Sequence, residues 1–212
     1  SGPGVITHRS RDASRATGTC IVMVGPDGER TMLPDPGAND GLTPGDLPVA
    51  EFRPGRHLHL TAYTLLREGS RAAALKAMAL ARSASMTVSV DASSAAPLAS
   101  AGTDRFLAWA GPADILFANE DEAEVLAGRS LTDIFGLVVV KRGPLGARAH
   151  GAAGDSWEVP AAPARARDTT GAGDAFAAGF LGAWTSGRGR RESLAEGASL
   201  ASRAVAVVGG RP

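Results

Sequence analysis

Short apolar runs alternate along this chain with longer amphipathic or Ala-rich segments. The alternating or continuous apolar runs predict strands at 57–63, 86–90, 114–118 and 137–140, and a pair of strands that ends at Val159. The longer segments predict helices at 70–84, 103–110 and 192–207. Because strands alternate with helices, we expect an α/β fold: a mostly parallel sheet flanked by helices on both faces.

An earlier pair of apolar alternations, 19–24 and 30–33, is joined by the turn residues Pro26-Asp27-Gly28 and predicts a β-hairpin. Cys20 lies in the first of these runs and is the only cysteine, so no internal disulfide can form. Its apolar surroundings predict a core position rather than a nucleophile. After Asp91, a run of Ser, Ala and Pro residues predicts a loop.

The composition narrows the class of protein. With 212 residues and 44% hydrophobic content, we expect one domain, 1–212, with one substantial core. Lys+Arg and Asp+Glu balance at 22 each, which indicates neither a nucleic-acid nor an anionic-membrane partner. No apolar run approaches the length of a membrane span and no signal peptide is visible, so a reducing, cytoplasmic setting is expected.

The sequence Asp168-Thr169-Thr170-Gly171-Ala172-Gly173-Asp174 precedes an apolar, small-residue segment that predicts a buried helix. The start of a helix offers unpaired N–H donors and a partial positive charge, and so can hold a phosphate or another anion. Asp174 lies at this helix start. It either caps the first turn or serves as a functional carboxylate beside the anion.

Two other nucleotide motifs are absent from the sequence. No Gly-x-x-x-x-Gly-Lys-Ser/Thr occurs, which excludes a P-loop enzyme. A dinucleotide-binding turn needs a further glycine three residues after Gly173, and Phe176 stands there instead.

The 168–174 stretch resembles the C-terminal signature of the ribokinase (PfkB) family of carbohydrate kinases. The resemblance implies that Asp174 takes the proton from a sugar hydroxyl while the amides of Gly171, Ala172 and Gly173 hold the transferring phosphoryl group. It implies an ATP-dependent kinase acting on the primary hydroxyl of a sugar or nucleoside-like substrate. It extends back to the hairpin and Pro36-Gly37-Ala38-Asn39, so that hairpin 18–34 would form part of a small lid over the sugar.

Two upstream segments also resemble this family. Asn119-Glu120-Asp121-Glu122 matches its Asn-x-x-Glu motif, which implies that Asn119 and Glu122 lie near the ATP phosphates and that Glu122 acts on Mg²⁺ through water. Taken alone, such a polar run more often caps a helix. The segment 141–147 resembles the nucleotide-side loop, with Lys141 near the phosphates and Gly143 and Gly146 in the loop; an ordinary strand-to-strand turn is the alternative.

The remaining candidate residues are less specific. Tyr63 falls near a substrate-contacting position of some ribokinases, or is simply a surface or core aromatic residue. In potassium-activated relatives, the residues matching Asp168 and Thr170 help to bind K⁺, together with a late loop resembling Val208-Gly209-Gly210. His57 and His59 share a strand face, but no third ligand at useful spacing accompanies them, which argues against a metal site.

Family members normally carry a long portion before the hairpin that includes sugar-binding groups, and this chain does not contain it. We therefore expect either that this chain is a fragment or that upstream residues of the protein precede those of this sequence. The resemblance implies a small-molecule sugar and ATP as partners. If the hairpin is part of a lid, its exposed edge offers a surface for a homodimer. A non-catalytic nucleotide- or metabolite-binding protein on the same scaffold is the alternative function.

Overall fold

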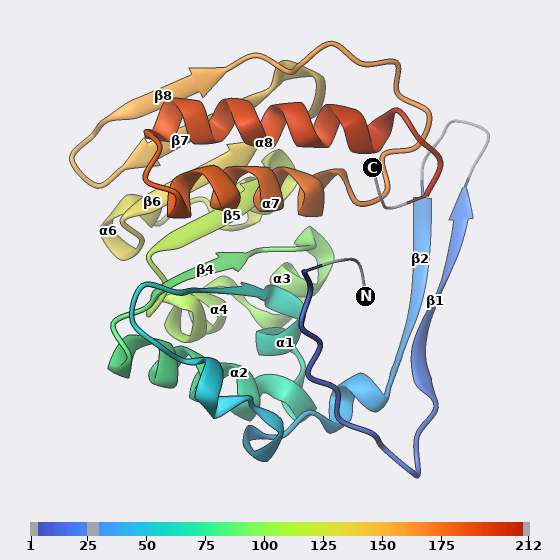
Figure 1. Ribbon diagram of the computed structural model, residues 1–212. Helices are drawn as coiled ribbons and strands as arrows, with labels where there is room; N and C mark the ends of the chain where they lie inside the picture. The colour runs from blue at the N-terminus through green and yellow to red at the C-terminus, as the bar shows by residue number, and fades with distance from the viewer. Residues whose placement is uncertain (1–3, 25–29, 210–212) are drawn as a thin grey trace.

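A six-stranded sheet forms the centre of the molecule, and a two-stranded hairpin stands apart from it (Figure 1). The structure, a computed structural model, describes residues 4–24 and 30–209. The strands are β1 (Thr17–Val24), β2 (Arg30–Gly37), β3 (His57–Thr61), β4 (Thr87–Asp91), β5 (Ile115–Asn119), β6 (Leu137–Lys141), β7 (Ala147–Gly151) and β8 (Ser156–Val159). The α-helices are α1 (Ala62–Leu66), α2 (Glu68–Ser83), α3 (Ala95–Ala101), α4 (Thr103–Ala110), α5 (Glu120–Val125), α6 (Leu131–Ile134), α7 (Ala172–Thr185) and α8 (Arg190–Val205).

The strands of the large sheet lie side by side in chain order, β3-β4-β5-β6-β7-β8. Strands β3 to β6 are parallel to one another, whereas β6, β7 and β8 form antiparallel pairs. Helices connect the parallel strands, because two parallel neighbours need a crossover connection. The predicted α/β fold with a mostly parallel sheet is confirmed.

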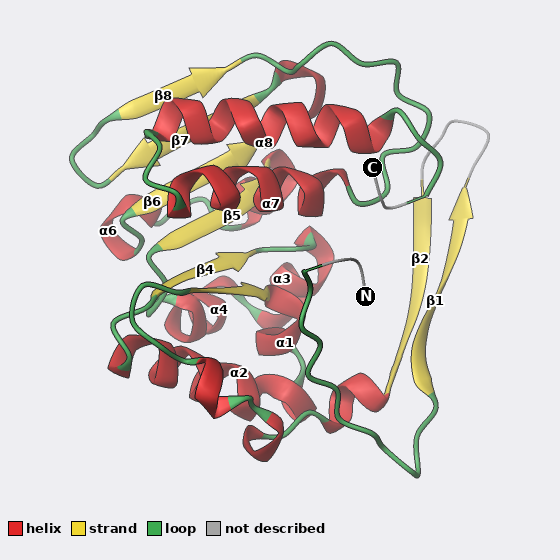
Figure 2. Ribbon diagram, in the orientation of Figure 1, coloured by secondary structure: helices red, strands yellow, loops and turns green. Residues whose placement is uncertain are grey.

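Helical layers cover both faces of this sheet (Figure 2). Side chains alternate between the faces along each strand, so Val88 of β4 packs in a core with Phe106 of α4, and helices α1 to α5 contribute to that core. On the other face, Phe117 of β5 packs with Phe180 of α7, and α8 completes this second core. In the described part of the chain, no helix combines the length and the apolar character needed to cross a membrane.

Two local predictions differ from the structure. The loop expected after Asp91 contains helix α3, whose Pro97 falls in the first turn, where a missing N–H costs no helical hydrogen bond. The strand expected at 57–63 ends at Thr61, and Tyr63 lies in helix α1. Both helices are short, and α1 packs against α2 and α4 while α3 packs against α4 and α5, so their stability comes from tertiary contacts rather than from local sequence pattern.

The hairpin is formed by β1 and β2, with Thr19 opposite Asp35 and Ile21 opposite Leu33. The predicted turn, Pro26-Asp27-Gly28, lies outside the described residues. Among the described residues, no helix layer covers the hairpin, so Ile21 and Leu33 are more than half exposed. Cys20 is exposed as well, and the predicted core position is wrong because a two-stranded ribbon by itself encloses no core.

Candidate functional site

The carboxyl ends of the four parallel strands meet along one edge of the sheet. Thr61, Asp91, Asn119 and Lys141 are the last residues of β3, β4, β5 and β6. Thr61 pairs with Asp91 and Asn119 pairs with Lys141 in the strand register, while Asp91 pairs with Phe117, two residues before Asn119. The four residues therefore lie along one edge, with β5 and β6 extending two residues beyond β3 and β4. Helix α7 begins at the same edge, since Gly173 lies beside the Lys141 ammonium group. The 168–174 stretch and the strand ends therefore come together, at the edge where open α/β sheets bind ligands.

A left-handed turn starts helix α7. Its N-cap residue, Gly171, has φ 74° and ψ 1°, a conformation that glycine adopts without strain. The Ala172 N–H donates to the Thr169 carbonyl at 3.3 Å, so this predicted anion donor already has a protein partner. In the described part of the chain, the N–H groups of Gly171, Gly173 and Asp174 have no hydrogen-bond acceptor. The Asp174 amide is thus a third open donor, which the motif alone did not indicate.

The Asp174 carboxylate is exposed at the third position of α7, and among the residues that the structure describes no backbone N–H donates a capping hydrogen bond to it. It therefore does not fill the capping role considered from the sequence. Burial lowers the pKa of the His59 ring, and the charges of Asp91 and, to a smaller extent, Asp174 act against that shift. His59 accordingly favours its neutral form.

Asp91, which the sequence did not single out, forms an ion pair with Lys141. The Oδ2 to Nζ distance is 2.5 Å, and the two side chains are only 8% and 14% exposed. Lys141 lies on β6 and Asp91 on β4, so the lysine side chain reaches past β5 to its partner. The alternative of an ordinary turn residue does not describe Lys141, which lies in the strand and in this buried pair.

Asn119 and Glu122 form a capping box at the start of α5. The Glu122 N–H donates to Asn119 Oδ1 at 2.7 Å, and the Asn119 N–H donates to Glu122 Oε2 at 2.8 Å. Glu122 is 3% exposed, and burial raises the pKa of its carboxyl group. The capping alternative is thus their observed local role, and it leaves the second carboxylate oxygen, Oε1, for other ligands.

The two glycines that follow β6 have different surroundings. Gly143 has φ 50°, and a Cβ there would meet nothing within 4 Å. Gly146 has φ 89°, and a Cβ there would overlap the backbone at Val159 and Pro160. The structure thus explains Gly146 by the close approach of neighbouring backbone, whereas Gly143 borders open space.

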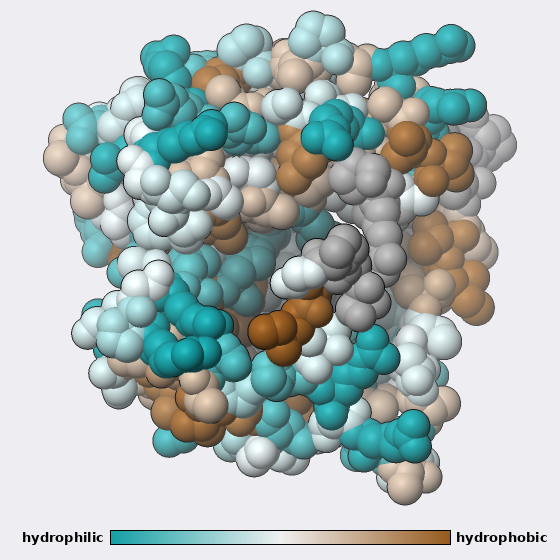
Figure 3. All heavy atoms as spheres, viewed as in Figure 1, coloured by the Kyte–Doolittle hydropathy of each residue, from teal (hydrophilic) through white to brown (hydrophobic). Residues whose placement is uncertain are grey.

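A cavity of about 740 Å³ lies between the hairpin and the segment 61–70, which contains α1 and the start of α2. Tyr63, Asn39 and Arg67 line it together with hairpin residues, including Cys20. The Tyr63 hydroxyl donates to the Ser93 carbonyl at 3.4 Å, and 40% of the residue is exposed. Figure 3 shows a hollow near the middle of the face seen in Figure 1, with hydrophilic side chains inside it.

Asp168 ties the start of the motif to the end of the chain. Its Oδ1 accepts the Thr170 N–H at 2.9 Å, and its Oδ2 accepts the Gly209 N–H at 3.0 Å. The 168–170 segment and the late Gly-containing loop therefore lie together, as expected. Gly210 of that loop lies outside the described residues.

His57 and His59 are engaged by hydroxyl groups of the neighbouring strand. The His57 ring nitrogens lie 2.8 Å from Thr87 Oγ1 and 2.7 Å from Ser89 Oγ, and His59 Nδ1 lies 2.7 Å from the same Ser89 oxygen. Burial lowers the pKa of His57 to about 4. Across residues 4–24 and 30–209, no three His, Cys, Asp or Glu side chains are grouped to hold a metal ion.

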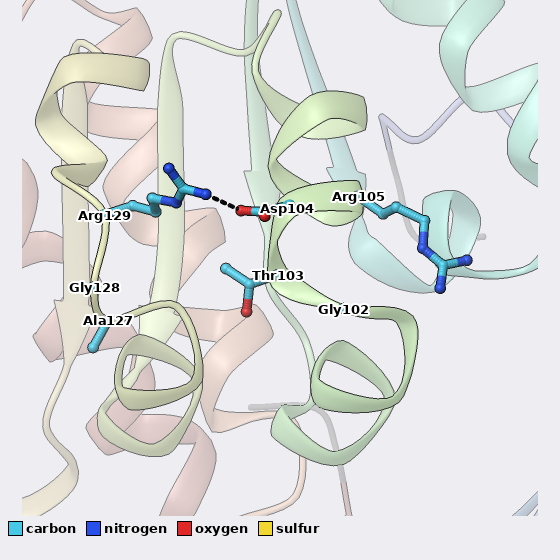
Figure 4. A pocket seen from close by; sticks show the side chains of 7 residues that line it. All are labelled: Gly102, Thr103, Asp104, Arg105, Ala127, Gly128 and Arg129. Carbon is cyan, nitrogen blue, oxygen red and sulfur yellow. Dashed lines mark hydrogen bonds and ion pairs between the residues drawn. The ribbon is translucent and has the colours of Figure 1, made fainter.

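A second, smaller cavity of about 370 Å³ lies at the start of α4. Figure 4 shows Arg129 directed toward Asp104, with which it pairs at 2.6 Å, while Arg105 points away from both. None of the residues predicted from the sequence lines this cavity. It is therefore separate from the site at the strand ends.

Comparisons with known proteins identify the family of this chain. The model of the pfkB family carbohydrate kinases matches residues 3–212. The chain is 34% identical over 175 residues to an ATP-dependent ribose-1-phosphate kinase of Halopiger xanaduensis, covering 79% of this chain and 54% of that protein. It is 32% identical over 196 residues to a fructokinase of Klebsiella pneumoniae, covering 83% of this chain and 61% of that protein.

Among solved structures, adenosine kinase from Sinorhizobium meliloti superposes with a TM-score of 0.84 at 27% identity, covering 92% of this chain and 63% of that one. The chain thus spans 54% and 61% of the two curated relatives' lengths. The family model covers residues 3–212, and the superposition with adenosine kinase covers 92% of this chain. Sequence and fold thus both resemble this family over nearly the whole chain. The chain belongs to the pfkB family of carbohydrate kinases.

Proposed function

We propose that this chain carries the phosphoryl-transfer site of an ATP-dependent kinase that phosphorylates the primary hydroxyl of a sugar or nucleoside-like substrate. The observation that carries the proposal is the start of α7, where open amides at Gly171 and Gly173 lie beside the exposed Asp174 carboxylate and the Lys141 ammonium group. The names of the relatives support both substrate classes, since they include a fructokinase and an adenosine kinase.

Each group has a defined task in this reaction. Asp174 accepts the proton of the acceptor hydroxyl while the oxygen of that hydroxyl forms a bond to the γ-phosphorus of ATP. The bond from that phosphorus to the β–γ bridging oxygen breaks, and its electron pair leaves with ADP. The open amides, with Ala172 as a weaker donor, and Lys141 stabilise the charge that spreads over the transferring group, since phosphoryl transfer depends mainly on positioning and electrostatic stabilisation.

The residues also fit ATP with Mg²⁺. Gly143 borders open space where a nucleotide can approach the backbone, with Gly146 shaping the same loop, and Asn119 lies at the neighbouring strand end. Glu122 retains one carboxylate oxygen outside its capping box, which suits a contact to Mg²⁺ through water. When bound, the metal neutralises charge on the phosphates.

The acceptor side of the site is the cavity beneath the hairpin. Tyr63 borders it with a partly exposed ring, so we assign it to the acceptor, and the hairpin acts as a lid. The exposed Ile21 and Leu33 support a homodimer formed through the lid, which a monomeric sedimentation profile of the full-length protein would refute. For a monovalent cation such as K⁺, Asp168 and Thr170 supply the oxygen atoms, and activity without K⁺ would exclude that role.

Replacing Asp174 by Asn in the full-length protein tests the function. Loss of the base should lower kcat by about a hundredfold or more across a panel of sugars and nucleosides, with ATP binding retained. Asp155→Asn, in an exposed turn of the β7–β8 connection, is the matched control and should keep full activity. Full activity of the Asp174 variant would refute the assignment. ATP binding without turnover by the unmodified protein would instead favour a non-catalytic binding protein.

A further inference from the structure

The buried pair between Asp91 and Lys141 joins two strand ends that are not neighbours. Asp91 ends β4, Lys141 ends β6, and β5 lies between them. Burying two charges is costly unless each is well paired and hydrogen-bonded. A pair held at this edge of the sheet, beside the start of α7, therefore calls for a role beyond stability.

The Asp91 carboxylate is fixed by the turn that follows it. Its Oδ1 accepts the Ser93 N–H at 2.9 Å, while Oδ2 accepts from Lys141. Ser93 has φ 68°, an unusual conformation for a residue with a side chain, and its hydroxyl donates to the Asp91 carbonyl at 2.8 Å. The Ala62 N–H donates in turn to the Ser93 hydroxyl at 3.1 Å. Both oxygens of the carboxylate are thus committed, and its position is set by backbone.

The Lys141 ammonium group keeps donors for a ligand. It donates to Asp91 Oδ2, and in the described part of the chain no other protein acceptor lies within hydrogen-bond distance of it. A Cβ built on Gly173 would lie 3.3 Å from Nζ, so the ammonium group lies against the first turn of α7. Asp91 therefore holds the cation beside the open Gly173 amide.

We propose that Asp91 is a positioning residue for phosphoryl transfer: it holds the Lys141 ammonium group at the start of α7, where that group contacts the transferring phosphoryl. The inference rests on the proposed function. A lysine side chain has four flexible bonds and would otherwise sample many positions. When Asp91 fixes the ammonium group before the reaction, the transition state does not have to order the lysine side chain or reorient its charge. Gly173 completes the arrangement because a side chain there would crowd the ammonium group.

A double-mutant cycle in the full-length protein tests this role. The variants are Asp91→Asn, Lys141→Met and the pair together, with kcat and the KM values for ATP and for the acceptor measured for each. Asn at position 91 retains an oxygen for the Ser93 N–H but lacks the charge that holds the lysine. We expect Asp91→Asn to lower kcat by about ten- to a hundredfold, with the acceptor KM unchanged. In the Lys141→Met background, the same change should have little further effect, because the residue acts through the lysine.

Two results would overturn the inference: an unchanged kcat in Asp91→Asn, or a loss of the same size whether or not Lys141 is present. The second result would indicate a merely structural role. If Asp91→Asn does not fold, Asp91→Ser carries the same cycle, since its hydroxyl can accept the Ser93 N–H. Asp174→Asn separates the two proposals: if it loses activity while Asp91→Asn keeps it, only the inference about Asp91 fails.

Discussion

Helix α7 crosses α8 at a glycine, and we predict that Gly179→Ala destabilises the protein although alanine is the better helix former. A Cβ on Gly179 would lie 2.6 Å from the Glu196 carbonyl oxygen and 3.1 Å from the Gly197 Cα, both in α8. These are backbone atoms, which cannot rotate away as a side chain would. The two helices would therefore have to separate.

The matched control lies one turn further along the same helix. Gly182 is exposed, and a Cβ there would meet nothing within 4 Å. Both substitutions gain about 1 kcal/mol from helix propensity, so the difference between the variants isolates the cost of overpacking. That cost is typically about 1 to 3 kcal/mol. Gly182→Ala should be stabilising, and Gly179→Ala should be less stable than it by this amount.

Urea denaturation followed by circular dichroism measures the difference, and thermal melting should separate the two variants by several degrees, since about 1 kcal/mol shifts Tm by roughly 2–4 °C at this size. Because α7 carries Asp174, separation of the helices should also lower kcat in Gly179→Ala and leave it unchanged in Gly182→Ala. Equal stabilisation of both variants would refute the reasoning about the helix crossing.

Two further predictions concern stability. Burial lowers the pKa of His57 from its ordinary 6.5 to about 4, so the stability it contributes is present above pH 6.5 and is lost as the pH falls toward 4. His57→Gln should remove this loss of stability at low pH from the pH profile of unfolding, and an unchanged profile would contradict the assignment. Comparing the two proteins cancels the opposite effect of Glu122, whose raised pKa favours the folded state at low pH. Asn119→Ala removes the hydrogen bond from the Glu122 N–H to Asn119 Oδ1 and should lower the free energy of unfolding in urea by about 1 kcal/mol. Asn119→Asp can still accept this bond and should lose less stability; equal losses in the two variants would argue against the cap.

The period of the apolar residues was enough to predict the strands of the large sheet and its longer helices. The strand ends could also be predicted to share one edge, because parallel strands in one sheet must end on the same side. The expectation that Asn119, Lys141 and the 168–174 stretch all act near the ATP phosphates came instead from the family resemblance, because α7 follows the antiparallel strand β8 and the rule for parallel strands does not place it. The left-handed turn at Gly171 likewise follows from a local run of small residues.

Other features required the tertiary structure. Helix α3 and the helical position of Tyr63 depend on packing against neighbouring helices, which outweighs weak local preferences. The exposure of Cys20 depends on what covers a strand pair, which an alternating pattern cannot tell. In the same way, the pattern at Asn119 was compatible with a cap or a ligand site, and only the coordinates revealed the reciprocal hydrogen bonds.

The sequence by itself determined the order of the elements, the family motif and the kind of chemistry that a helix start with a carboxylate can support. Only the tertiary structure decided which charges meet: Asp91 and Lys141 are 50 residues apart and are joined across an intervening strand. The physical reason is that local sequence governs backbone conformation over a few residues. The distance between two side chains from separate strands depends instead on register, strand order and the packing of the helix above them.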